Sequence, residues 1–129
     1  MILAVHSTDF ATWAGLSKFV ITRNRDRFDK APELDSASRE RFLLNKKNYL
    51  EVLRLGGSPG QYGEGEVVHL VTTREFQRVS GVPDHVLKYH HQHLDRVPGF
   101  GRPFKLYLTE KNIEAAKQLY KPQKTSSLV

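Results

Sequence analysis

The chain has 129 residues, and its 20 basic and 14 acidic side chains give a formal charge of +6 at pH 7. It contains no cysteine, which excludes disulfide frameworks and thiolate metal sites, and its apolar fraction of 39% is too high for a disordered chain. No apolar run approaches the roughly 20 residues of a membrane span, and we find no signal-peptide pattern at the start. We therefore expect a cytoplasmic, nucleoid-associated protein without a membrane partner, whose positive charge favours a polyanion.

Near the start of the chain, the pattern predicts two short helices joined by a turn. Ser7 or Thr8 is expected to cap the first helix, because short hydroxyl side chains accept a hydrogen bond from a backbone N–H there. Gly15 permits the left-handed conformation that ends this helix, and Ser17 caps the second helix, over 18–24. This arrangement is typical of a helix-turn-helix.

The segment after the second helix is expected to form a β-hairpin, the wing of a winged helix. It spans about 27–44, and Asn45 then caps a further helix that carries Tyr49, Val52 and Leu53. Several acidic residues lie in or beside the hairpin: Asp26, Asp29, Glu33, Asp35 and Glu40. Because carboxylates repel phosphates, we expect this wing to stand away from a duplex.

The middle of the chain is rich in glycine. Residues 56–65 contain five glycines and one proline, which exclude a helix or a central strand. We predict a first unit over 1–56, a linker over 57–66, a second unit over 67–120 and a flexible tail over 121–129. A loop inside a single domain is the alternative to a linker.

The second half shows a clearer helix-turn-helix pattern. Thr72 or Thr73 is expected to cap a helix with Glu75 in its first turn, where a carboxylate is favourable. Gly81 ends this helix, and Pro83 suits the first turn of the next one, since its missing N–H costs nothing there.

A second hairpin and a last helix follow. The Gly/Pro-rich stretch 97–103 reads as the tip of the hairpin, and Phe104, Leu106 and Leu108 alternate as in a strand. Thr109 begins a helix that places apolar residues on one side. The second half is therefore also expected to be a winged helix.

The two halves resemble each other. A shift of 66 aligns residues 9–21 with 75–87, and a shift of 62 to 64 aligns 41–49 with 103–113. Residues 1–57 carry 10 basic and seven acidic side chains, and residues 58–129 carry the same numbers. We therefore expect a mainly α fold with short β wings, built from two winged helix-turn-helix units in tandem.

The motifs of the second half have a family resemblance. Residues 72–76, 81–82 and 86–90 read Thr-Thr-Arg-Glu-Phe, Gly-Val and Val-Leu-Lys-Tyr-His. They resemble the start of MerR-type and excisionase-like winged helices, which carry Thr-x-x-Glu-Leu-Ala, then Gly-Val-Ser and Thr-Leu-Arg-Tyr-Tyr. The family's Arg-x-Tyr wing is approximated by residues 102–107.

This resemblance covers about residues 70–119, and the sequence departs from the family at Gln77 and Pro83. It implies a DNA-binding unit whose second helix enters the major groove. The chain shows neither a long dimerisation helix nor an effector domain, so a metal- or drug-sensing regulator is not implied.

A recognition helix needs exposed hydrogen-bond donors near its start, where base edges are within reach. Wing cations suit phosphate or minor-groove contacts. The candidate DNA-binding residues are Ser17, Lys18, Thr22, Arg23, Arg25 and Arg27 in the first unit, and His85, Lys88, Tyr89, His91, Arg96, Arg102 and Lys105 in the second. Asp84 either accepts a hydrogen bond from cytosine or repels phosphate.

Other chemistry finds little support in the sequence. Of the clustered histidines, only His90 and His93 share a helix face, and they lack a third ligand at metal spacing. His6, Ser7 and Asp9 include the residue types of a hydrolase triad, but capping of a helix explains these neighbours better. We expect no catalytic residues, no metal and no cofactor.

We therefore expect a non-enzymatic protein that binds double-stranded DNA sequence-specifically and regulates transcription. Two units on one chain would grip groove segments about 34 Å apart, whether the protein is a monomer or a homodimer. The alternatives are an excisionase-like factor that bends DNA for recombination, and a module that binds and inhibits a protein partner. A nucleic-acid enzyme would need a clustered metal-dependent site, which the sequence does not show.

Overall fold

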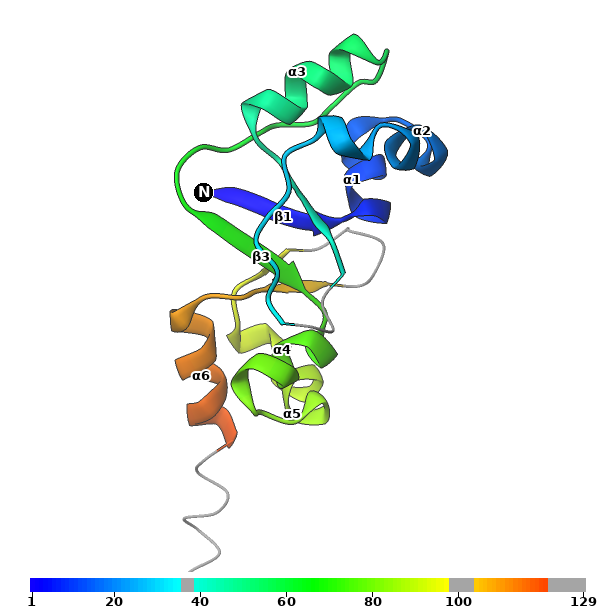
Figure 1. Ribbon diagram of the computed structural model, residues 1–129. Coiled ribbons are helices and arrows are strands. Elements are labelled where there is room, and N and C mark those ends of the chain that lie inside the picture. The colour runs from blue at the N-terminus through cyan, green and yellow to red at the C-terminus, as the bar shows by residue number, and fades with distance from the viewer. Residues whose placement is uncertain (36–38, 98–103, 121–129) are drawn as a thin grey trace, which may run out of the picture. The chain divides into compact units, whose positions relative to one another are not determined.

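The computed structural model of the chain describes residues 1–35, 39–97 and 104–120. Its residues divide into two compact units, Met1–His69 and Leu70–Val129 (Figure 1). The boundary between the units falls inside a strand. Among the described residues, no helix combines the length and apolar character needed to cross a membrane.

The first unit begins with a strand that leads directly into a helix. Its elements are β1 (Ile2–His6), α1 (Ser7–Ala14), α2 (Lys18–Arg23), the 3₁₀ turn η1 (Arg25–Arg27), β2 (Arg41–Leu43) and α3 (Lys46–Arg54). The apolar residues that open the chain favour a strand, and Ala4 and Val5 in β1 are fully buried.

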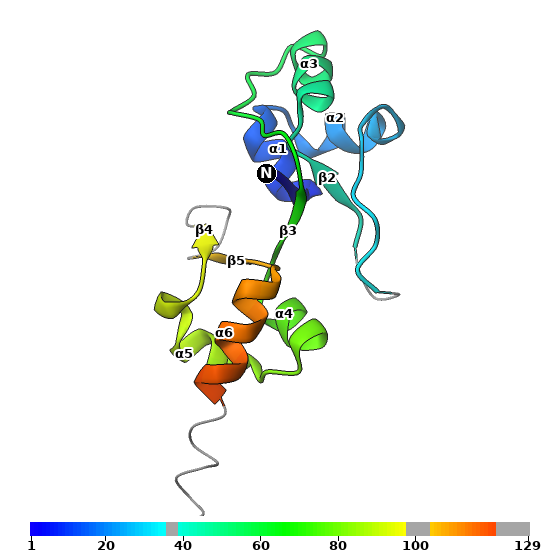
Figure 2. The same ribbon diagram turned by 90° about the vertical axis from the view of Figure 1, so that its left-hand side faces the viewer.

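The second unit begins with β3, which crosses the boundary between the units. Its elements are β3 (Val67–Val71), α4 (Thr73–Ser80), α5 (Asp84–Tyr89), the 3₁₀ turn η2 (His91–His93), β4 (Arg96–Val97), β5 (Lys105–Tyr107) and α6 (Glu110–Tyr120). Figure 2 shows α4, α5 and α6 side by side, and each of the three helices contacts the other two.

The two units repeat the same order of elements. The bounds of α1 and α2 differ from those of α4 and α5 by 66, and the bounds of β2 differ from those of β5 by 64. Even a small pairing recurs, because the isolated bridge between Lys30 and Phe42 corresponds to the pairing of Arg96 with Leu106.

The expected fold class was wrong, because the protein is a mixed α/β structure with a five-stranded sheet. β1 pairs antiparallel with β2 and parallel with β3 in the first unit, and β5 pairs antiparallel with β3 and β4 in the second. The strand order is β2-β1-β3-β5-β4. The strands that begin the two repeats, β1 and β3, are central to this sheet and were not expected as strands, so a mainly α fold with short wings does not describe the chain.

An aromatic cluster forms the core of the first unit. Phe10 on α1 stacks on Phe42 from β2 at 4.9 Å between ring centroids, and Phe28 meets Phe10 edge-on at 5.0 Å. All three rings are buried. Edge-on and offset contacts of this kind stabilise beyond their buried area, by about 1 kcal/mol each.

The core of the second unit is built from aliphatic side chains around one aromatic ring. Phe76 on α4 and Leu106 on β5 are fully buried, and Leu87 on α5 is nearly so. Val82 lies in the turn between α4 and α5 and is 2% exposed. The side of α5 that carries Leu87 therefore packs on the core.

One buried asparagine ties three segments of the first unit together. The side-chain nitrogen of Asn48 on α3 donates to the carbonyl oxygens of Asp29 at 3.0 Å and Leu43 at 2.7 Å. Its side-chain oxygen accepts a hydrogen bond from the backbone N–H of Asp29 at 2.8 Å. Asn48 is fully buried, so it satisfies backbone groups that water does not reach.

The second unit contains the same arrangement around Asn112 on α6. Its side-chain nitrogen donates to the carbonyl oxygens of Asp95 at 2.7 Å and Tyr107 at 2.8 Å, and its side-chain oxygen accepts from the backbone N–H of Asp95 at 2.8 Å. Because the same three hydrogen bonds recur at equivalent positions, the two units share an internal design as well as an order of elements.

The glycine-rich residues 57–66 are held against the first unit. The backbone N–H of Ser58 donates to the carbonyl oxygen of Ala14 at 2.9 Å, and the N–H of Gly60 donates to that of Trp13 at 3.0 Å. The indole N–H of Trp13 donates to the carbonyl oxygen of Gln61 at 2.8 Å. The segment predicted as a linker thus packs on the first unit along much of its length.

Gly57 lies where a side chain does not fit. A Cβ atom there would lie 2.5 Å from the carbonyl oxygen of Ala14 and 2.6 Å from Cγ1 of Val52. Gly57→Ala is therefore expected to lower the free energy of unfolding by about 2 kcal/mol in urea titrations. Gly60→Ala is the control, since its Cβ would meet only the side chain of Trp13 at 3.1 Å. Equal stability of the two variants would contradict this account of the segment.

Candidate nucleic-acid interface

The turn between α1 and α2 has the predicted geometry. Gly15 ends α1 in the left-handed conformation with φ at 65°, and the side chain of Ser17 caps α2 by accepting from the N–H of Val20 at 3.2 Å. The expectation for the start of α1 was wrong. His6 occupies the capping position in extended backbone without a side-chain cap, because β1 continues up to the first helical residue, Ser7.

The turn between α4 and α5 is also as predicted, apart from Pro83. Thr72 and Glu75 form a reciprocal capping box, with 2.9 Å from the N–H of Thr72 to the carboxylate and 3.2 Å from the N–H of Glu75 to the hydroxyl. Gly81 is left-handed with φ at 79°. Pro83 lies at the capping position, one residue before α5, and not in its first turn as expected. Each unit therefore presents a second helix at the position that sequence analysis assigned to DNA reading.

In the first unit, the candidate residues lie on exposed surface. These are Ser17, Lys18, Thr22, Arg23, Arg25 and Arg27. Arg25 pairs with Glu40 at 2.7 Å, which raises the pKa of Arg25, and Arg27 lies 4.0 Å from Glu51. Arg23 lies over the ring of Phe19, which is 70% exposed. Ile21 is the buried residue of α2, while the side chains of Lys18 and Arg23 are exposed to solvent.

In the second unit, His85, Lys88 and Tyr89 project from α5, and Tyr89 is 83% exposed. His91 is half-buried, stacks on Phe104 at 4.4 Å between ring centroids, and lies 2.8 Å from the Arg96 guanidinium through Nδ1. Because the guanidinium always donates, Nδ1 of His91 accepts and Nε2 carries the proton.

The candidate residues Lys105 and Arg102 do not lie on α5. Lys105 is buried in β5, with 6% of its surface exposed, so its ammonium is not on the accessible surface with the others. Arg102 lies outside the described residues.

Two acidic residues of the first hairpin, Asp29 and Glu40, are paired with nearby cations. Asp29 accepts from the ammonium of Lys47 at 2.8 Å and from the side chain of Asn45 at 3.1 Å, and the hydrogen bond from Lys47 lowers the pKa of Asp29. Glu40 is bound by Arg25. The repulsion expected between a phosphate and these two carboxylates is therefore partly offset by their own cations.

Asp84 begins α5 and pairs with Lys88 at 3.1 Å. The hydroxyl of Thr73, and then the ammonium of Lys88, lower the pKa of the Asp84 carboxyl despite partial burial. A carboxyl whose pKa is lower in the folded than in the unfolded state stabilises the fold at pH values above its pKa in the unfolded chain, which is about 4. This contribution is lost as the pH falls through the pKa of the folded state.

Asp84→Asn is accordingly expected to destabilise the chain at pH 7. The difference from the wild type should shrink as the pH drops through the folded-state pKa, because both side chains are then neutral. Urea unfolding of both proteins at pH 7 and at about pH 3 measures this. A difference that is the same at both pH values would show that Asp84 acts without its charge.

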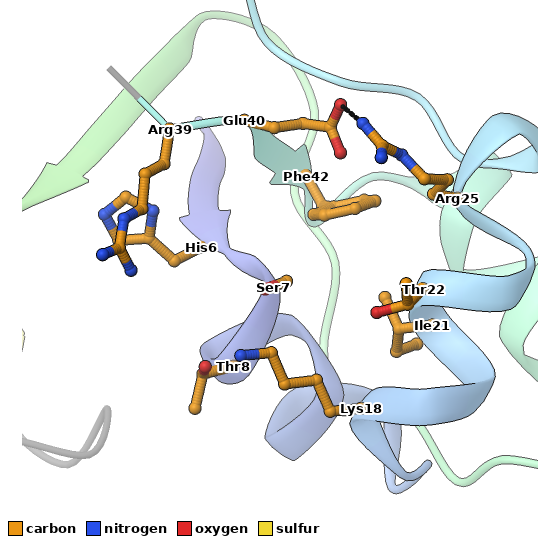
Figure 3. A pocket seen from close by; sticks show the side chains of 10 residues that line it. All are labelled: His6, Ser7, Thr8, Lys18, Ile21, Thr22, Arg25, Arg39, Glu40 and Phe42. Atoms are coloured by element: carbon orange, nitrogen blue, oxygen red, sulfur yellow. Dashed lines mark hydrogen bonds and ion pairs between the residues drawn. The ribbon is translucent and has the colours of Figure 1, made fainter. Parts of the chain in front are cut away.

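A pocket of about 200 Å³ lies between α1, α2 and the approach to β2 (Figure 3). Figure 3 shows the side chain of Lys18 reaching from α2 toward Thr8, while Arg39 lies beside His6. Lys18 was among the candidates expected from the sequence, whereas Arg39 was not. Arg39 is far from α2 along the chain and is brought close only by the pairing of β2 with β1, so no local pattern marks it.

The histidines do not form a metal centre. The rings of His90 and His93 lie 6.2 Å apart, and no group of three or more metal-ligating side chains occurs in the part of the chain that the structure describes.

No protein-family model matches the chain, and neither curated proteins nor solved structures give a significant match.

Proposed function

We propose that this chain binds double-stranded DNA through the exposed sides of α2 and α5, one helix from each repeated unit. In this proposal the protein is non-enzymatic, reads sequence and regulates transcription. The observation that carries it is the recurrence of one arrangement: a helix, a left-handed glycine turn and a second helix with polar and cationic residues outward.

The second helix of such a motif fits the major groove, and its exposed donors then reach base edges. On α2 this donor is Arg23, and on α5 the donors are His85 and Lys88. Lys18 and Thr22 are also exposed on α2, where they can contact the backbone of the duplex. The buried sides of both helices hold them on their cores, so the reading residues are presented from rigid elements.

The charges also support the proposal. Exposed Arg23, with its guanidinium over Phe19, is available to a phosphate or to a guanine edge. Arg96 is positioned by His91, which limits the entropy lost when it binds phosphate. Both units carry more basic than acidic side chains, 10 against nine in residues 1–69 and 10 against five in residues 70–129, which favours a polyanionic partner.

Selection of bound duplexes from a random pool tests this function. The proposal predicts an enriched motif with a footprint longer than one turn of duplex, about 10 base pairs, because two helices read it. Fluorescence anisotropy with an enriched duplex and a scrambled duplex then gives the specificity. A pool that shows no enrichment, together with equal affinity for both duplexes, would reject sequence-specific binding.

A further inference from the structure

We propose that the pocket of the first unit binds a phosphate group, which anchors the DNA backbone beside α2; this inference rests on the proposed function. The pocket encloses about 200 Å³ and is lined by Lys18, Arg25 and Arg39 together with the hydroxyl side chains of Thr8 and Thr22. Cations and hydroxyl donors around one space suit a tetrahedral oxyanion.

Two of the cations are available to a ligand. The carboxylate that lines the pocket, Glu40, is taken by Arg25 at 2.7 Å. Neither Lys18 nor Arg39 forms an ion pair with any residue that the structure describes. An incoming anion would therefore meet two cations without displacing an internal partner.

In the second unit, a carboxylate of the protein itself stands at the position that corresponds to Lys18. With the shift of 66 that relates the helices, Asp84 stands at the position of Lys18, and Lys88 stands at the position of Thr22. The Asp84 carboxylate pairs with Lys88 at 3.1 Å. The second unit thus fills this position with its own carboxylate, whereas the first unit surrounds it with cations and leaves it open.

The asymmetry assigns different roles to the two units. The first unit anchors one backbone phosphate in the pocket, which fixes the position of α2 on the duplex. The second unit makes no equivalent contact, because Asp84 would repel the phosphate. A phosphate from a free phosphorylated molecule satisfies the same chemistry, so the source of the group is decided by experiment.

The first test replaces Lys18 by the residue that stands at the equivalent position of the second unit. Lys18→Asp gives the first unit the residue of the second, and duplex affinity is expected to fall about tenfold, with a salt dependence lower by about one phosphate contact. Lys46→Asp is the matched control, since it makes the same charge change on exposed surface of the same unit. Equal losses for the two variants would overturn the backbone anchor. Arg39→Gln repeats the test at the second cation without a charge reversal.

The second test adds inorganic phosphate to the wild-type chain and follows backbone amides by NMR, with chloride at equal ionic strength as the reference. Saturable shifts at Thr8, Lys18 and Thr22, without shifts at Asp84, support a phosphate site in the first unit. Such shifts with no specific effect of Lys18→Asp on DNA would assign the pocket to a free phosphorylated molecule and overturn the backbone anchor. No shifts and no specific effect would reject the site.

This design separates the two proposals. A wild-type chain that does not bind duplex refutes the proposed function, while the phosphate titration still decides whether the pocket holds an anion. A chain that binds duplex with unchanged affinity after Lys18→Asp keeps the proposed function and loses the anchor.

Discussion

A chain that carries Arg23→Glu and Lys88→Glu is expected to bind duplex DNA about 100-fold more weakly than the wild type. Each reversal removes a cation from the exposed side of a second helix and places a carboxylate where a phosphate or an acceptor on a base would lie. We expect about tenfold from each unit, and the effects multiply if both units hold the same duplex. Fluorescence anisotropy at one fixed salt concentration measures the loss.

Lys46→Glu with Lys117→Glu is the matched control. These exposed lysines lie on α3 and α6, one in each unit, and the double change alters the net charge by the same amount. Thermal unfolding of both double variants establishes that they fold. If the control pair weakens binding as much as the first pair, the affinity depends on net charge and not on α2 and α5.

Asn48→Ala is expected to lower the free energy of unfolding by about 3 kcal/mol or more. The change removes three hydrogen bonds to the backbone of Asp29 and Leu43 and opens a cavity under α3. The carbonyl oxygen of Asp29 keeps one hydrogen bond, from the backbone N–H of Leu43 at 3.1 Å. Asn112→Ala removes the equivalent three bonds from the second unit, so a loss of similar size is expected there.

Urea unfolding of both variants gives the two losses. Asn24→Ala is the control, because Asn24 is only half-buried and its side chain donates one hydrogen bond, to the carbonyl oxygen of Val20 at 2.9 Å. A loss at Asn48 no larger than at Asn24 would show that the buried network is not a main source of stability.

The helix boundaries could be predicted from the sequence because they depend on local chemistry. Ser17 and Asn45 cap helices with their own side chains, and Gly15 and Gly81 adopt the left-handed conformation that favours glycine. Thr72, one of the two expected caps of α4, forms a capping box with Glu75, which was expected only in the first turn.

The sheet could not be predicted in the same way. β1 and β3 are short segments of five residues, each with four apolar residues and one histidine, and such a pattern does not by itself distinguish a buried strand from a helix. Their parallel pairing joins Ile2 with Val67, and this depends on contacts between residues that are far apart in the chain. The fold class was therefore wrong although most of the helices were placed correctly.

The candidate site also has a part that local sequence predicts and a part that depends on contacts between distant residues. Residues on α2 and α5 could be selected from helical spacing, because burial of Ile21 and Leu87 fixes which side faces outward. The pocket could not, since it needs Arg39 from the approach to β2 beside Lys18 from α2. The burial of Lys105 was not predicted either. The alternating pattern of its strand does not show which other elements of the fold pack over this side chain.

The salt dependence of duplex affinity tests the central claim most directly. If cationic sides of both repeated units contact the backbone, the logarithm of the association constant should fall linearly with the logarithm of salt concentration. With about five phosphate contacts, the expected slope is about −4 or steeper. An affinity for duplex that stays constant as the salt concentration rises from about 50 to about 200 mM would contradict the account.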